Sequence, residues 1–177
     1  GNLLASDSIT VTTTFIGPDP VRDLRITELM YHPADLTPEE VAAGYLDSDE
    51  FEYIELRNIG PHPLDLASLQ LTVGVSFDFS EAAVTTLAPG AYLLVVENSA
   101  AFDFRYGMPN AAIAGEFSGR LDNAGERIVL QTNPGVTVHD FIYDDNGVGW
   151  HASTDGNGYS LVILDAGVPV EEWSNSA

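Results

Sequence analysis

Residues 49–58 read Asp49-Glu50-Phe51-Glu52-Tyr53-Ile54-Glu55-Leu56-Arg57-Asn58, and from Phe51 to Arg57 apolar and polar side chains alternate except at the apolar pair Tyr53-Ile54. Alternation with a period of two is typical of a β-strand, whose successive side chains point to opposite faces of a sheet. The following Ile59-Gly60-Pro61 ends the strand, because glycine and proline interrupt regular structure. The glutamates flank the apolar positions, so we expect one face in the core and Glu50, Glu52 and Glu55 toward solvent.

Further short strands are predicted along the chain, most from β-branched or alternating residues and the one at 91–96 from an unbroken apolar run that indicates a fully buried strand. They lie at residues 6–16, 24–31, 63–75, 77–79, 91–96, 127–131, 136–143 and 159–164, between turns rich in Gly, Pro, Asn and Asp. Two brief helices are predicted, at 37–44 with a threonine cap and a capping-box glutamate, and at 99–107 with a serine cap. Many short strands with tight turns predict an all-β sandwich or barrel, not an α/β fold.

The charge balance narrows the range of partners. The chain has 177 residues, with six arginines, no lysine and 27 acidic residues, for a net charge of −21. Nucleic acid and anionic membranes bind mainly to Lys and Arg, so neither is expected as a partner. Membrane insertion is not expected either, because no apolar run approaches about 18 residues. Basic proteins and divalent cations remain possible partners for a chain of this charge.

The absence of cysteine restricts the chemistry. It rules out disulfides, cysteine nucleophiles and thiolate metal sites, so any metal site must use oxygen or histidine ligands. Gly1 to Ala5 lack the basic end and apolar run of a signal peptide. An export signal would therefore lie upstream of Gly1 or does not exist.

Several stretches, in this order, resemble the lamin tail domain, a family of immunoglobulin-like sandwiches. They are residues 26–33 (Ile-Thr-Glu-Leu-Met-Tyr-His-Pro), 49–58, 64–66 (Leu-Asp-Leu), 87–96 (Leu-Ala-Pro-Gly-Ala-Tyr-Leu-Leu-Val-Val), 121–130 (Leu-Asp-Asn-Ala-Gly-Glu-Arg-Ile-Val-Leu), 140–143, Trp150 and 155–161. The resemblance spans about residues 22–165. The chain departs from it at Leu69, where the family often carries tryptophan.

The resemblance implies a fold and a role. It implies an immunoglobulin-like β-sandwich of about nine strands with one or two short loop helices. It also implies a structural or protein-interaction (tethering) module of a larger exported bacterial protein, placed outside the cell or on its surface. The partner would be another protein or neighbouring domains of the same chain. No catalytic residues define the family, so none is carried over.

The domain organisation is predicted from the first residues. Residues 6–16 are β-branched and alternating, which predicts a strand, and the two prolines of Gly17-Pro18-Asp19-Pro20 predict a stiff linker after it. This pattern is typical of the last strand of a preceding immunoglobulin-like repeat and of the linker that follows it. We therefore predict that residues 1–20 end a preceding module and that residues 21–177 form the lamin-tail-like domain. The alternative is that the first strand pairs into this same domain.

Catalysis is not predicted. The chain has no Gly-x-Ser-x-Gly elbow, and His32, His62, His139 and His151 show no metal-binding spacing. We interpret them as ordinary surface or loop histidines, and we predict no enzyme activity and no required cofactor. A hydrolase stays the least favoured alternative.

Calcium-dependent adhesion is the most specific alternative function. Acidic loops carry the candidate ligands Asp47, Asp49, Glu50, Asp144, Asp145, Asp155 and Asn157. Calcium takes six to eight oxygen ligands, which such loops supply, although no stretch completes an EF-hand. The competing interpretation is that Asp, Asn and Gly are turn residues of an acidic protein.

A carbohydrate-binding module is the other alternative, because sandwiches can present aromatic platforms to glycans. The candidate rings are Trp150, Trp173, Tyr45, Tyr106 and Tyr143. Large aromatic side chains more often lie in a core, so this function requires that the rings be exposed.

Overall fold

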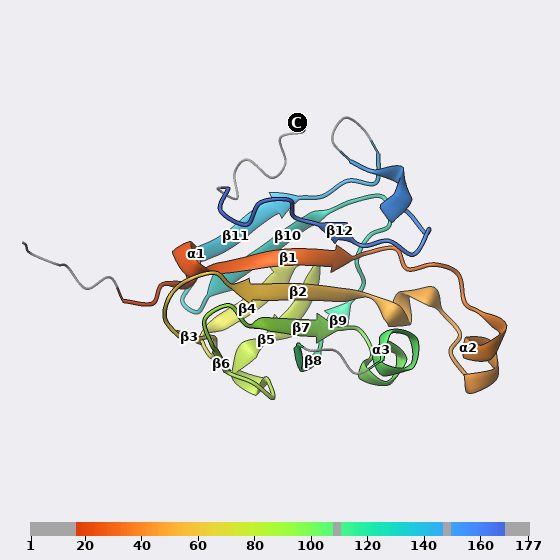
Figure 1. The fold of residues 1–177 in the computed structure, drawn as a ribbon, viewed down its shortest axis with the longest axis horizontal. Helices are drawn as coiled ribbons and strands as arrows, with labels where there is room; N and C mark the ends of the chain where they lie inside the picture. The colour runs from red at the N-terminus through yellow and green to blue at the C-terminus, as the bar shows by residue number, and fades with distance from the viewer. Residues whose placement is uncertain (1–16, 108–110, 147–149, 169–177) are drawn as a thin grey trace, which may run out of the picture.

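The computed structural model describes residues 17–107, 111–146 and 150–168, which form two five-stranded sheets packed face to face (Figure 1). The predicted all-β, immunoglobulin-like sandwich is confirmed, with twelve strands in these ranges instead of about nine. Part of the difference is a small third sheet of two-residue strands, β3 (Leu64–Asp65) and β6 (Thr86–Leu87), which are too short to show a period. The predicted strand 6–16 lies outside the described residues, and the division at residue 20 stays a prediction.

The first sheet has the strand order β12-β1-β2-β7-β8. Its members are β1 (Leu24–Met30), β2 (Tyr53–Asn58), β7 (Tyr92–Val96), β8 (Ala112–Glu116) and β12 (Leu161–Val162). β1 and β2 pair antiparallel, and a bulge between Ile26 and Glu28 absorbs one residue. β7 runs parallel to β8, which requires a crossover connection, and α3 (Ser99–Tyr106) lies within it.

The second sheet has the order β11-β10-β4-β5-β9. Its members are β4 (Leu69–Val73), β5 (Val75–Asp78), β9 (Ser118–Gly119), β10 (Arg127–Thr132) and β11 (Thr137–Ile142). The turn before β10 depends on Gly125, which has φ +98°. A Cβ at this position would lie 2.5 Å from the carbonyl oxygen of Tyr143, so only glycine fits the turn.

The core lies between the two sheets. The buried side chains include Leu24, Ile26, Ile54, Leu56, Leu93 and Val95 from the first sheet and Leu69, Leu71, Ile128, Leu130 and Val138 from the second. At one end the rings of Tyr31 and Tyr143 pack with centroids 4.9 Å apart. Burial of these apolar faces is the main favourable contribution to folding.

Buried Asn58, the last residue of β2, links the loop that follows it to the end of β6. Its Nδ2 donates hydrogen bonds to the carbonyl oxygens of His62 and Leu87, each at 2.8 Å, and its Oδ1 accepts one from the Gly60 backbone N–H at 2.9 Å. Both N–H groups and the oxygen of the Asn58 amide are thus hydrogen-bonded, which explains how this polar side chain can be buried.

Residues after 150 close the edge of the first sheet. η3 (Ala152–Thr154) places the Thr154 hydroxyl 2.9 Å from that of Tyr31. β12 pairs with β1, and beyond it the Ile163 backbone N–H donates to the Thr27 carbonyl at 3.0 Å. β12 has only two residues, so the strand predicted at 159–164 is shorter than expected.

The helices are short and lie in connections. They are α1 (Pro20–Asp23), α2 (Pro38–Ala43), α3, and the 3-10 turns η1 (Ser48–Phe51), η2 (Phe79–Glu81) and η3. The capping box of α2, made by Thr37 and Glu40, is confirmed. The predicted cap of α3 is wrong, because Asn98 caps it through hydrogen bonds from Ala100 and Ala101. No helix in the described ranges is long and apolar enough to span a membrane.

Candidate functional site

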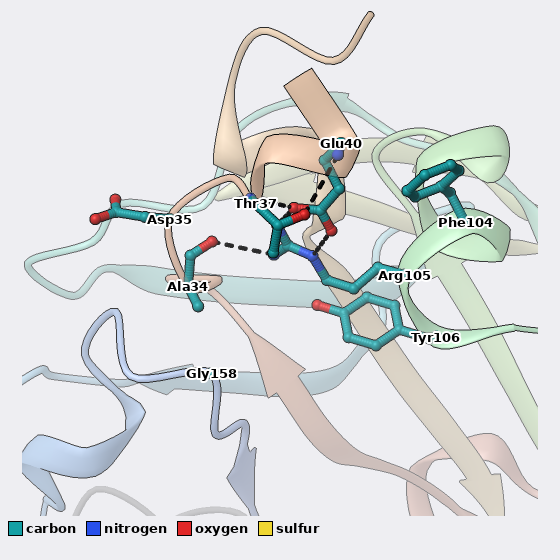
Figure 2. A pocket seen from close by; sticks show the side chains of 8 residues that line it. All are labelled: Ala34, Asp35, Thr37, Glu40, Phe104, Arg105, Tyr106 and Gly158. Atoms are coloured by element: carbon teal, nitrogen blue, oxygen red, sulfur yellow. Dashed lines mark hydrogen bonds and ion pairs between the residues drawn. The ribbon is translucent and has the colours of Figure 1, made fainter. Parts of the chain in front are cut away.

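A hollow of about 420 Å³ opens between α2, α3 and the turn at Gly158 (Figure 2). Its lining comprises Ala34, Asp35, Thr37, Glu40, Phe104, Arg105, Tyr106 and Gly158. The capping box of α2 fixes Glu40 on one side, and α3 carries the aromatic residues and Arg105 on the other. The hollow is therefore built on two capped helices that the sheet edge supports.

A buried ion pair lies in the hollow between the two helices (Figure 2). Arg105 Nε and Nη2 donate to the Glu40 carboxylate at 2.7 and 2.8 Å, and Nη1 donates to the Ala34 carbonyl at 3.1 Å. The side chains are only 14% and 4% exposed, respectively. The hydrogen bonds from Arg105 lower the pKa of Glu40 to about 2. The guanidinium also lies 3.6 Å from the ring centre of Phe51.

Exposed apolar side chains lie on the two helices of the hollow and in the residues just after α2. Phe104 is 48% exposed, and Tyr45 packs edge-on against it at 5.3 Å. Val41 and Leu46, on α2 and just after it, are also exposed. We name the hollow together with Val41, Leu46 and Phe104 the α2–α3 surface. The charges of Glu40 and Arg105 are paired with each other, so the exposed apolar contact area of this surface comes from Val41, Leu46 and Phe104.

Three of the predicted calcium ligands lie around η1. Arg120 Nη1 donates to Asp47 Oδ2 at 2.6 Å and to Asp49 Oδ2 at 2.8 Å. The hydrogen bond from Arg120 lowers the pKa of Asp47. Glu50 completes a second capping box by accepting from the Asp47 backbone N–H at 3.3 Å, and it also accepts from the Asn98 amide. An arginine thus occupies the place between the two aspartates where a metal ion was expected.

Glu52 is wholly buried, so its predicted exposure to solvent is wrong. It precedes β2 at the end of the sandwich, where the chain at Leu121 crosses over it. Its Oε2 accepts the Leu121 backbone N–H at 2.9 Å, whereas its Oε1 is buried and has no hydrogen-bond partner. Burial, and then the charges of Asp49 and Glu97, raise the pKa of Glu52 to about 9.

The remaining calcium candidates lie in two other loops. Asp144 and Asp145 accept hydrogen bonds from Asn146, which follows them. Asp155 accepts from His32 Nδ1 at 2.5 Å, and Asn157 donates to the Asp155 carbonyl. Across ranges 17–107, 111–146 and 150–168, no three His, Asp or Glu side chains gather closely enough to hold a metal ion. Calcium binding stays a prediction.

The family profile described as Lamin Tail Domain matches residues 18–145, which include every strand from β1 to β11. The chain belongs to the lamin tail domain family. A search of curated proteins found no match. The family is a protein-interaction type of immunoglobulin-like domain and is generally non-catalytic.

The aromatic candidates for glycan binding are dispersed in this lamin tail domain. Tyr143 is fully buried and donates its hydroxyl to the Asp122 carbonyl at 2.8 Å, so it cannot belong to an exposed platform. Trp150 is partly buried against the core, and Trp173 lies outside the described residues. Tyr45 and Tyr106 lie beside the hollow and pack against other rings.

The histidines of the lamin tail domain fit the prediction with one exception. His139 is wholly buried in β11, where its Nε2 lies 3.0 Å from the Leu24 carbonyl oxygen. Burial, and then the nearby Arg25, lower the pKa of His139 to about 3, so it is a neutral core residue. The burial of His139 could not be predicted from sequence, because a polar residue between Val138 and Asp140 gives no local sign that it faces the core.

The ion pairs that build these sites could not be predicted from sequence. Glu40 and Arg105 are 65 positions apart, and Asp47 and Arg120 are 73 apart. Only the capping box of α2 signalled a structured loop at Glu40. A rare arginine in a very acidic chain is a weak additional signal, because such a cation is expected to be paired with acids.

Proposed function

We propose that this lamin tail domain is a non-catalytic protein-interaction module that tethers a larger exported bacterial protein to a protein partner at the cell surface or outside the cell. The resemblance to bacterial exported proteins supports the location. The observation that carries the interaction role is the α2–α3 surface, where Phe104 and Leu46 are exposed beside a rigid, ion-paired hollow. Neighbouring domains of the same chain are included among the partners.

The α2–α3 surface has the features of a contact site. Exposed apolar side chains that cluster beside a preformed hollow favour protein binding, and aromatic residues often contribute most of the binding energy. The bidentate pair of Arg105 and Glu40 keeps the hollow in shape before any partner arrives, which lowers the entropy lost on binding. Exposed Asp35, Glu39 and Asp103 surround it, so the complementary partner carries basic groups.

Site-specific photo-crosslinking tests this function. A photoreactive phenylalanine analogue at position 104 should capture a partner from the native extracellular fraction or within the full-length protein. The same analogue at Tyr92 is the control, because that ring is 40% exposed and lies on β7. Isothermal titration with the purified partner should then show about 30-fold weaker binding for Phe104→Ala, as for a typical hot spot, and unchanged binding for Tyr92→Ala.

Two outcomes would overturn the proposal. One is equal capture from positions 104 and 92. The other is a partner whose affinity is unaffected by Phe104→Ala although circular dichroism shows the variant to be folded.

A further inference from the structure

The first described residues are fastened to one end of the sandwich. Residues 17–23 span the predicted division at residue 20 and contain α1, which leads directly into β1. Figure 1 shows α1 at the end of the sandwich where β1 begins, and α1 also packs against β11. The segment thus contacts the second sheet before the chain enters the first.

Asp23 is the residue that holds this segment together. Its side chain is 5% exposed, and Arg22 donates to both carboxylate oxygens, from Nε to Oδ1 at 2.7 Å and from Nη2 to Oδ2. The Asp19 backbone N–H donates to the same carboxylate at 3.2 Å. The hydrogen bond from Arg22 lowers the pKa of Asp23, so the carboxylate is ionised at neutral pH. A buried carboxylate is tolerated here because charged and backbone donors surround it.

Two further hydrogen bonds extend this contact along the chain. The Asp23 carbonyl accepts the Ile59 backbone N–H at 2.7 Å, which ties the segment to the loop after β2. Arg22 Nη2 donates to the Gly17 carbonyl at 2.7 Å, which ties the start of the segment back to α1. The two ends of residues 17–23 are therefore both held.

Gly60, in the loop after β2, leaves the space that Asp23 occupies. A Cβ at position 60 would lie 2.5 Å from Asp23 Cγ and 2.6 Å from Asp23 Cβ, far closer than non-bonded carbon atoms pack. Rotation of the carboxylate would not relieve a clash with Cβ. Asn58 Oδ1 accepts the Gly60 backbone N–H at 2.9 Å and so fixes the glycine in place. The loop is thus shaped to receive Asp23.

We propose that Arg22, Asp23 and Gly60 form a clamp that holds residues 17–23 against the sandwich, so that the chain before Gly17 leaves the domain in one fixed direction. Pro18 and Pro20 fix φ on either side of Asp19, which leaves few bonds about which the segment can rotate. A module that precedes Gly17 would then keep its orientation relative to the sandwich. The clamp uses none of the residues of the α2–α3 surface, so it stands apart from the proposed binding function.

Limited trypsin digestion of the 177-residue chain tests whether the clamp is closed. Trypsin cleaves after arginine and lysine, and Arg22 is one of only six such positions. Cleavage requires local opening of the chain. Gly60→Ala should accelerate cleavage after Arg22 by about tenfold or more, because overpacking of this kind is costly and the sequence around the cut is unchanged. Mass spectrometry of the released fragment 1–22 identifies the cut.

Gly44→Ala is the matched control. Gly44 has φ +104°, so alanine is strained there, but its Cβ would touch nothing and the position lies at the end of α2. This variant loses stability without contact to Asp23 and should leave the rate of cleavage after Arg22 unchanged. Equal acceleration in the two variants would overturn the proposal, and so would a wild-type rate in Gly60→Ala.

A distance measurement tests the fixed direction itself. The chain has no cysteine, so Gly17→Cys and Thr72→Cys would carry two nitroxide labels at defined positions, with Thr72 exposed on β4. Double electron–electron resonance should give one narrow distance distribution. The added change Asp23→Asn, which keeps the size of the side chain but removes its charge, should broaden it. A broad distribution with Asp23 in place, or the same narrow one in Asp23→Asn, would overturn the proposal even if Gly60→Ala does not fold.

Discussion

Replacing Glu40 by Gln should destabilise the fold by about 3 kcal/mol at pH 7. The carboxylate is 4% exposed and pairs with Arg105, which lowers its pKa from 4.5 to about 2. At about 1.4 kcal/mol for each pKa unit, this difference corresponds to about 3 kcal/mol. Glutamine keeps an oxygen for Arg105 but removes the charge, so the variant leaves a buried cation without a counter-ion.

The pH dependence checks the same reasoning. Because the folded-state pKa of Glu40 lies below its unfolded value, its stabilisation is fully present above pH 4.5 and is lost as the pH falls through about 2. Urea unfolding followed by circular dichroism at several pH values should show the gap between wild type and Glu40→Gln closing over that interval. Glu39→Gln is the control, since Glu39 is an exposed neighbour on α2 and should change stability by less than about 0.5 kcal/mol. Equal losses in the two variants, or a gap that does not vary with pH, would refute the assigned role of the ion pair.

Three further outcomes are expected. His139 should stay neutral at pH 5 in NMR titration, and its contribution to stability, complete above pH 6.5, should be lost as the pH falls toward 3; an imidazolium signal in the folded protein at pH 5 would contradict its burial. Asn58→Ala should lower the free energy of unfolding by about 3 kcal/mol, because three hydrogen bonds of the buried amide disappear; a loss below about 1 kcal/mol in urea unfolding would show that they contribute little. Gly125→Ala should destabilise the fold more than Gly135→Ala, although φ is +98° and +97° at the two positions, because only the first Cβ meets the Tyr143 carbonyl; similar Tm values would show that the contact relaxes at no cost.

The strands that alternate or are wholly apolar could be predicted from sequence. β2, β7 and β10 fall where alternation or an unbroken apolar run predicts them, because both patterns are local properties of the chain. The capping box at Thr37 was also readable, since all its parts lie within four residues. The family resemblance added the order of these strands, and with it the sandwich.

Features that depend on distant contacts could not be predicted. β8 (Ala112–Glu116) is rich in alanine and glycine and becomes a strand through its parallel pairing with β7. Glu52 looks like a solvent-facing residue by pattern, yet the crossing of the chain at Leu121 buries it. Loop composition predicts candidate calcium ligands but carries no information on Arg120, which pairs with Asp47 and Asp49.

The border of the family match and the border of the closed sheet do not coincide. The match stops at residue 145, whereas β12 covers the outer edge of β1 only after residue 160. A recombinant fragment cut at 145 would present the backbone of β1 as an open template for strands of other molecules, whereas the two-residue β12 blunts that edge in the longer chain. We therefore expect a fragment that ends at residue 145 to self-associate more readily than one that includes β12.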